Sequence, residues 1–126
     1  MGLTNLKLIV ANPKDESKHS TVEFLVDSGT IYSVLDEQVL KSLGVEPGSE
    51  EEFILADGTV IKRKKGGLVY KYKDEVSYAP VIFGKKGDSN LLGATTLESL
   101  GFSLDPFRRQ LFKLPMVLGG LRNQGV

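Results

Sequence analysis

A carboxylic acid placed directly at the end of an apolar run constrains the fold of this chain more than any other feature. Residues 24–26 are Phe, Leu and Val, which predict a strand buried on both faces, and Asp27 follows them at the rim of the core. Gly29 lets backbone N–H groups approach the carboxylate, and the hydroxyls of Ser28 and Thr30 can donate hydrogen bonds to it or to its surroundings. The sequence therefore predicts a partly buried carboxylate that is held by its neighbours.

The composition fits one compact domain and argues against several kinds of partner. The chain has 126 residues, of which 40% are hydrophobic, which suffices for one core but not for two domains of ordinary size. We expect one domain over residues 1–114 and leave the tail at 115–126 unassigned. Sixteen basic and sixteen acidic residues cancel, whereas nucleic acid or an anionic membrane would require a basic surface excess. We therefore expect neither as a partner.

The chain contains no cysteine and one histidine, His19, which is expected in a solvated loop. A disulfide framework and a thiolate site are thereby excluded, and we expect no metal site and no cofactor. The first ten residues do not resemble a secretory leader, and no apolar run approaches the length of a membrane span. These observations together predict a cytoplasmic protein.

The first part of the chain predicts a hairpin that delivers the acid, followed by a strand and a helix. Branched residues at 6–10 and 21–26 predict two strands, which a polar turn over residues 12–19 would join. Residues 31–35 predict another short strand. The stretch 36–44 has apolar residues at helical spacing, an acidic first turn and a terminal glycine, and so predicts a helix of about two turns.

A second hairpin is predicted in the middle of the chain. Apolar runs at 53–55 and 59–61 flank Asp57 and Gly58, and Asp-Gly between two such runs is a strong short-range hairpin signal. The basic run at 62–65 is predicted to be an exposed strand edge that discourages aggregation. A binding patch is the less favoured interpretation, because no aromatic residue interrupts the run.

The remaining strands are predicted from apolar runs and breaks. Glycines at 66–67 are expected to end a strand, after which 68–72 and 76–83 would form a further hairpin. The runs at 102–104 and 110–114 are expected to complete the sheet.

The chain also contains a loose internal echo. An apolar strand end with a glycine turn, followed by a helix ending in Ser-Leu-Gly, occurs at 26–29 with 41–44 and again at 91–93 with 98–101. A Thr-x-x-Glu capping box predicts that the second helix spans 95–101. Only the first copy carries an acid in its glycine-containing turn, Asp27.

The segment 24–30 resembles the active-site signature of aspartic proteases. The similarity is greatest to the small single-lobe retroviral-type (retropepsin-like) enzymes and their bacterial and archaeal relatives. In that family a flap hairpin follows, and then an apolar-apolar-Gly turn and a short helix, which cross beneath the active site. The resemblance covers about residues 5–114 and implies a mainly β fold, a single-lobe acid-protease β-barrel with two short helices.

The resemblance also implies roles for individual residues. Asp27 would be the catalytic residue, supported by Ser28, Gly29 and Thr30. The other matches are the floor formed by the second turn, Leu91, Leu92 and Gly93, and the flap, Ala56, Asp57, Gly58 and Thr59.

The chemistry of this family needs two carboxylates that share one proton, and this chain supplies one such motif. A catalytic site would therefore be a homodimer with two-fold symmetry, in which the Asp27 carboxylates of the two chains meet at the axis. The substrate would be an extended peptide, bound as an added strand between flap and floor.

The sequence departs from retroviral members at two places. An acidic residue and an arginine that pair with each other there are replaced by Ile31 and Ala94, so the dimer contacts must be built differently. Two alternatives stay open. One keeps the fold but only binds peptides or dimerises, and the other is an unrelated β-barrel in which Asp-Ser-Gly is an ordinary turn.

Overall fold

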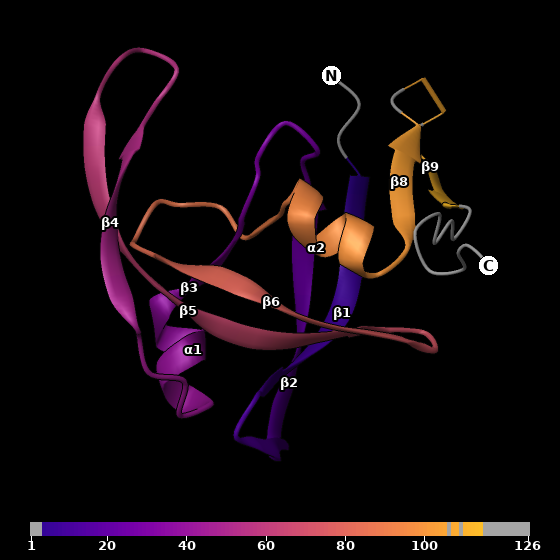
Figure 1. The fold of residues 1–126 in the computed structure, drawn as a ribbon, viewed down its shortest axis with the longest axis horizontal. Coiled ribbons are helices and arrows are strands. Elements are labelled where there is room, and N and C mark those ends of the chain that lie inside the picture. The colour runs from indigo at the N-terminus through magenta and orange to yellow at the C-terminus, as the bar shows by residue number, and fades with distance from the viewer. Residues whose placement is uncertain (1–3, 106, 109, 115–126) are drawn as a thin grey trace, which may run out of the picture.

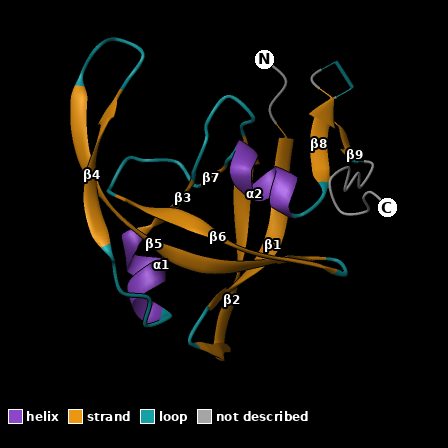
Figure 2. Cartoon of the chain, viewed as in Figure 1, coloured by secondary structure: helices purple, strands orange, loops and turns teal. Residues whose placement is uncertain are grey.

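The computed structural model describes residues 4–105, 107–108 and 110–114, and these residues are mainly β (Figures 1 and 2). The strands are β1 (Thr4–Asn12), β2 (Asp15–Val26), β3 (Ser33–Asp36), β4 (Ser49–Ile54), β5 (Val60–Tyr72), β6 (Glu75–Gly84), β7 (Leu91–Leu92), β8 (Phe102–Asp105) and β9 (Gln110–Lys113). The helices are α1 (Glu37–Ser42) and α2 (Ala94–Ser99). The tail from residue 115 lies outside the described residues.

Seven strands form one sheet in the order β1-β2-β7-β3-β6-β5-β4, and β1 pairs in addition with β5. The extra pairing joins six of these strands into a closed ring, and β4 lies outside the ring as an edge strand. Strands β8 and β9 form a separate two-stranded sheet, so the prediction that they complete the main sheet is wrong. The mainly β architecture with two short helices agrees with the predicted fold class.

The first hairpin is longer than the sequence predicted. The polar stretch expected to be a turn over residues 12–19 is mostly strand, because β2 already begins at Asp15. The turn is tight: the Asn12 side chain accepts a hydrogen bond from the Lys14 N–H and donates one to the Leu43 carbonyl. His19 pairs with Ala11 and is exposed, which corrects the prediction of a loop residue. Polar residues are tolerated there because this part of β2 faces solvent.

Strand β5 contains two further corrections. The basic run 62–65 is not a sheet edge, since it pairs with residues 49–52 of β4, which include three glutamates. Opposite charges across the pair favour this register. The glycines at 66–67 do not end the strand, which continues to Tyr72. A side chain at Gly66 would approach Phe83 and the Glu46 carbonyl to 3.1 Å, so the glycine serves close packing.

The two helices begin differently. Asp36 caps α1 by accepting a hydrogen bond from the Gln38 N–H at 2.7 Å, as the acidic helix start indicated. Gly93 precedes α2 and makes no side-chain cap, so the predicted capping box and the start at Thr95 are wrong. The Thr95 N–H donates instead to the Ile31 carbonyl at 3.0 Å. The Ile31 carbonyl is thus bonded to the start of α2 and not to a neighbouring strand, and β3 begins at Ser33 rather than at residue 31.

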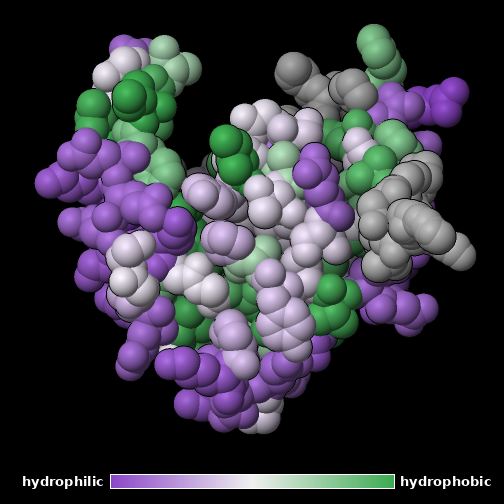
Figure 3. All heavy atoms as spheres, in the orientation of Figure 1, coloured by the Kyte–Doolittle hydropathy of each residue, from purple (hydrophilic) through white to green (hydrophobic). Residues whose placement is uncertain are grey.

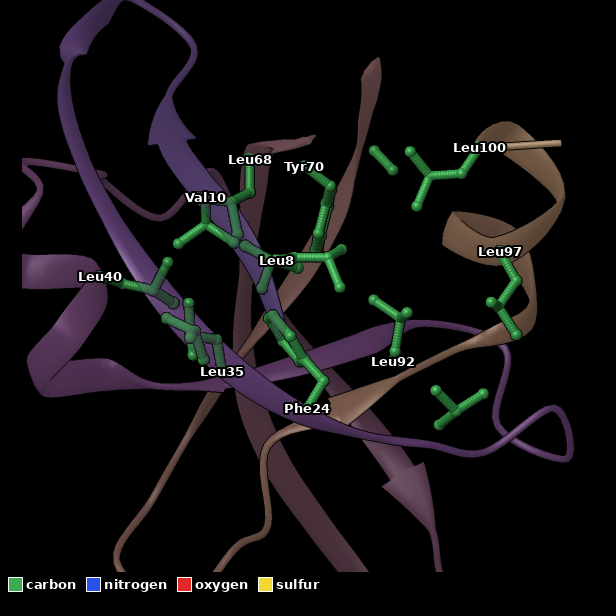
Figure 4. Close-up of a cluster of buried hydrophobic side chains, with 14 of the residues drawn as sticks. Leu8, Val10, Phe24, Leu35, Leu40, Leu68, Tyr70, Leu92, Leu97 and Leu100 are labelled. Atoms are coloured by element: carbon green, nitrogen blue, oxygen red, sulfur yellow. The ribbon is translucent and has the colours of Figure 1, made fainter. Parts of the chain in front are cut away.

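The core lies inside the closed sheet and beneath the two helices (Figure 4). Its largest fully buried side chains include Leu8, Phe24, Leu35, Leu40, Leu68, Tyr70, Leu92 and Leu100. The Tyr70 hydroxyl donates to the Pro80 carbonyl at 3.0 Å, and burial raises the pKa of this phenol, which therefore stays protonated. In the part of the chain that the structure describes, no helix is long and apolar enough to cross a membrane.

Candidate active site

Asp27 lies where β2 ends, next to the parallel strand β7. Leu25 pairs with Leu91 and Val26 with Leu92. The Asp27 N–H continues this ladder by donating to the Leu92 carbonyl at 3.0 Å. The register fixes the backbone of Asp27 at the end of two packed strands.

The Asp27 carboxylate is half-buried and accepts two hydrogen bonds from its own turn. The Gly29 N–H donates to Oδ1 at 3.0 Å, and the Thr30 hydroxyl donates to Oδ2 at 3.0 Å. The Thr30 N–H also donates to the Asp27 carbonyl at 3.1 Å. The structure thus holds the carboxylate as the sequence predicted, with Gly29 and Thr30 as its partners. Ser28 is exposed, and its hydroxyl makes no hydrogen bond within the described residues.

A second turn crosses the first at close range. We call residues 27–32 the acid turn and residues 92–95 the glycine turn. The Ala94 N–H donates to the Thr30 carbonyl at 2.7 Å, in addition to the bond from Thr95 to Ile31. A Cβ atom at Gly93 would lie 2.6 Å from the Tyr32 carbonyl carbon, a distance that only glycine permits. The structure therefore brings the predicted floor residues against the predicted acid turn.

Two buried hydroxyls that the sequence analysis did not identify support this crossing. Ser33 Oγ accepts a hydrogen bond from the Gly93 N–H at 3.0 Å and lies 2.6 Å from the Thr96 hydroxyl. Both side chains are fully buried. Their only sequence signal is a hydroxyl residue next to an apolar one, which does not by itself distinguish a buried partner from a solvated residue.

The predicted flap is the tip of the β4–β5 hairpin, which projects away from the closed part of the sheet (Figure 1). Gly58 has a positive φ of 87°, and the Thr59 N–H donates to the Asp57 carboxylate at 2.9 Å. The hydrogen bonds from Thr59 lower the pKa of Asp57. Within the described chain, no hydrogen bond joins this tip to Asp27, so these residues and the acid turn remain separate in one chain.

Apolar side chains are exposed near the hairpin tip and on the acid turn. Ile54 is 77% exposed, Val60 55% and Ile31 66%. Figure 3 shows apolar surface on the hairpin and a hollow between the hairpin and the body of the molecule. These surfaces are suited to cover an apolar chain or a second protein surface.

A separate hollow of about 510 Å³ lies along β5, and Pro13, Gly67, Tyr78 and Pro80 contribute to its lining. Asp27 does not line it. The hollow is shallow and open, whereas the Asp27 carboxylate is held by specific donors. Among the described residues, no group of three or more His, Cys, Asp or Glu side chains is placed to hold a metal ion.

The comparisons with known proteins concern the fold. No protein-family model matches the chain, and no curated protein sequence matches it. Among solved structures, it is similar to EIAV protease complexed with the inhibitor HBY-793, with a TM-score of 0.59 and 16% identity over 81% of this chain and 91% of that one. It is also similar to a retropepsin-like aspartic protease from Rickettsia conorii, with a TM-score of 0.53 and 20% identity over 82% and 86%. The chain therefore has the retropepsin-like fold.

Proposed function

We propose that this protein is a homodimeric aspartic endopeptidase in which each chain contributes one Asp27 carboxylate. The observation that carries the proposal is the half-buried Asp27 carboxylate, held by Gly29 and Thr30 at the crossing of two turns. It occurs in a fold shared with solved aspartic proteases.

The reaction follows from two like charges brought into hydrogen-bond range. Two adjacent carboxylates cannot both ionise, so the pair keeps one proton. The ionised partner takes a proton from a water molecule, which attacks the peptide carbonyl carbon. The protonated partner donates its proton to the carbonyl oxygen, which gives a tetrahedral diol. The C–N bond of the diol then breaks as the first carboxyl gives its proton to the leaving nitrogen, and the second carboxylate takes a proton from a diol hydroxyl, which restores the starting pair. Thr30 and Gly29 would keep each carboxylate oriented throughout.

A homodimer is supported by the single Asp-Ser-Gly-Thr motif in the sequence and by the exposed groups beside it. A two-fold axis next to Asp27 would bring the exposed Ser28 hydroxyl and the exposed Ile31 side chain toward their copies. Ser28 would then gain a hydrogen-bond partner across the axis. Ile31 would be covered by apolar surface where retroviral enzymes place a charge.

The substrate we propose is an extended peptide that lies between the β4–β5 hairpin and the acid turn. An extended chain can pair its backbone with the hairpin while its side chains point alternately to the two sides. The exposed Ile54 and Val60 side chains near the hairpin tip favour apolar substrate residues.

The experiment that tests the proposal is cleavage of a mixed unstructured peptide substrate across enzyme concentration and across pH 3 to 8. We expect turnover to rise faster than linearly with enzyme concentration, because the active species is a dimer. Asp27→Asn should abolish turnover, because a pair of amide side chains has no carboxylate that can take a proton from water. Asp74→Asn, in the exposed β5–β6 turn, is the matched control and should retain activity.

Two results would contradict the proposal. Turnover that survives in Asp27→Asn, after purification excludes a contaminating protease, would place the chemistry elsewhere. Absence of turnover in a wild-type protein that sedimentation shows to be dimeric would instead favour a peptide-binding or dimerisation module with the same fold.

A further inference from the structure

The base of the β4–β5 hairpin makes an electrostatic contact with the acid turn. Lys65 Nζ lies 2.6 Å from the Glu51 carboxylate and 5.1 Å from the centroid of the Tyr32 ring. Only 26% of the Lys65 side chain and 36% of the Glu51 side chain are exposed. A cation within about 6 Å of an aromatic ring is attracted to its face, and partial burial strengthens this attraction. Lys65 thus connects β4, β5 and Tyr32.

Lys65 occupies the point where the hairpin leaves the body of the molecule. It pairs with Ile82, and the β5–β6 pairing begins at this residue. Before it, residues 60–64 pair only with β4, which is itself an edge strand. A contact at Lys65 therefore acts at the hinge of the projecting hairpin.

Tyr32 belongs to the same turn as the Asp27 carboxylate. Its backbone lies against Gly93, and the turn is fixed on its other side by the bond from the Thr30 hydroxyl to Asp27. The ring of Tyr32 is half-buried. The Tyr32 ring is therefore attached to a backbone with little freedom to move, so it can serve as a fixed contact for Lys65.

The other members of the basic run do not make this contact. Lys62 and Lys64 are exposed and form no ion pair within the described residues. Arg63 pairs with Asp88 in the β6–β7 loop at 2.9 Å. The basic residues of the run therefore differ in their contacts, and Lys64 is a matched control for Lys65.

We propose that Lys65 is a positioning residue, which orients the β4–β5 hairpin over Asp27 by binding the Glu51 carboxylate and the Tyr32 ring together. Lys65 itself does not touch the reacting atoms. The inference rests on the proposed function, because an oriented hairpin matters for a peptide held beneath it. It adds to that function a specific link between the hairpin and the acid turn.

The test combines amide hydrogen exchange with steady-state kinetics. Lys65→Met keeps the length and apolar stem of the side chain and removes the charge. We expect it to speed exchange in residues 53–61 about threefold or more, and to raise KM about three- to tenfold with little change in kcat. Exchange in β1 and β6 should not change, which distinguishes positioning from general destabilisation. Lys65→Arg should restore both readouts, and Lys64→Met should resemble the wild type.

Substitutions at Tyr32 test the other end of the contact. Tyr32→Phe keeps an aromatic face and should behave as the wild type, whereas Tyr32→Leu should shift both readouts in the same direction as Lys65→Met but by less, because the Lys65–Glu51 ion pair remains. The double variant Lys65→Met with Tyr32→Leu should be no worse than Lys65→Met alone, because the contact with the Tyr32 ring is already lost in that single variant.

The outcomes separate this inference from the proposed function. Unchanged exchange in Lys65→Met, or changed exchange with an unchanged KM in an active enzyme, would overturn the positioning role. Equal effects of Lys65→Met and Lys64→Met would also overturn it. If amide exchange in the hairpin changes but the wild-type protein shows no turnover, the result would support the Lys65 contact and refute the proposed endopeptidase activity.

Discussion

The acid turn and the glycine turn follow two paired strands, yet their polar groups are arranged in opposite ways. In the acid turn, the Asp27 carboxylate is half-buried and takes its hydrogen bonds from its own residues. In the glycine turn, Leu92 and Gly93 are buried, and the Gly93 N–H bonds to Ser33 from another strand. One turn presents a carboxylate, and the other packs against the backbone of that turn.

The register of the two strands explains why only the first of the two echoed turns carries an acid. Because Val26 pairs with Leu92, Gly93 occupies the place in the second strand that Asp27 occupies in the first. A side chain at Gly93 would overlap the backbone of the acid turn. The second carboxylate of a dyad therefore cannot come from the corresponding position of the same chain. This constraint supports the proposal that it comes from a second copy.

The largest expected effect comes from giving the glycine turn a side chain. In Gly93→Ala, the new Cβ atom would lie 2.6 to 2.7 Å from three backbone atoms of Ile31 and Tyr32. Backbone cannot move aside as a flexible side chain can, so we expect a loss of about 3 kcal/mol or more in the free energy of unfolding. Urea denaturation at fixed protein concentration measures it.

Gly29→Ala is the control in the acid turn. Its Cβ atom would lie 3.3 Å from Asp27 Oδ1, a side-chain atom that can shift slightly. We expect a cost in stability of about 1 kcal/mol or less. Equal destabilisation by the two alanines would contradict the view that the glycine turn is the more tightly packed of the two.

A smaller effect is expected from removing the buried hydroxyl that joins the turns. Ser33→Ala leaves the Gly93 N–H and the Thr96 hydroxyl without their partner in a site closed to water. An unsatisfied buried polar group costs about 1–3 kcal/mol, so we expect about 2 kcal/mol of destabilisation. Thermal or urea unfolding provides the measurement.

Ser28→Ala is the matched control, because this hydroxyl is exposed and bonds to no described residue of the same chain. Its unfolding free energy at low protein concentration, where subunits are apart, should match the wild type. A cost for Ser28→Ala as large as that for Ser33→Ala would contradict the view that the buried hydroxyl, and not the exposed one, stabilises the crossing of the two turns.

The sequence predicted those parts of the molecule that depend on local patterns. The strand before Asp27, the helix capped by Asp36 and the hairpin at Asp57 and Gly58 each have a signal within a few residues. The held carboxylate was predictable for the same reason, since its partners Gly29 and Thr30 lie two and three residues away.

Features that depend on distant partners were not predictable in this way. The capping box at Thr95 is a good local signal, but the Thr95 N–H bonds to Ile31 in the acid turn. The glycines at 66–67 resemble a break, yet the strand continues because β6 pairs along it. Ser33 and Thr96 are 63 residues apart in sequence. Tertiary contacts decided each of these cases over local preference.

The smallest effect we predict concerns the loop that leads into the glycine turn. Asp88 binds the Arg63 guanidinium at 2.9 and 3.3 Å and accepts the Lys85 N–H at 2.7 Å. Arg63 lowers the pKa of Asp88 in the folded protein. About a third of this side chain is exposed, so we expect Asp88→Asn to cost only about 0.5–1 kcal/mol at pH 7.

The pH dependence of this cost has a definite sign. A carboxylate whose pKa is lower in the folded state stabilises the fold above its unfolded pKa of about 3.9, and this contribution disappears as the pH falls through the folded pKa. The difference in unfolding free energy between wild type and Asp88→Asn should therefore be constant from pH 7 to about 5 and shrink toward pH 3. Arg63→Gln should produce the same dependence, and the double variant should add nothing. A difference that stays constant down to pH 3 would show that Asp88 stabilises the loop through hydrogen bonds that do not depend on its charge, and a difference that grows on acidification would contradict the lowered folded pKa.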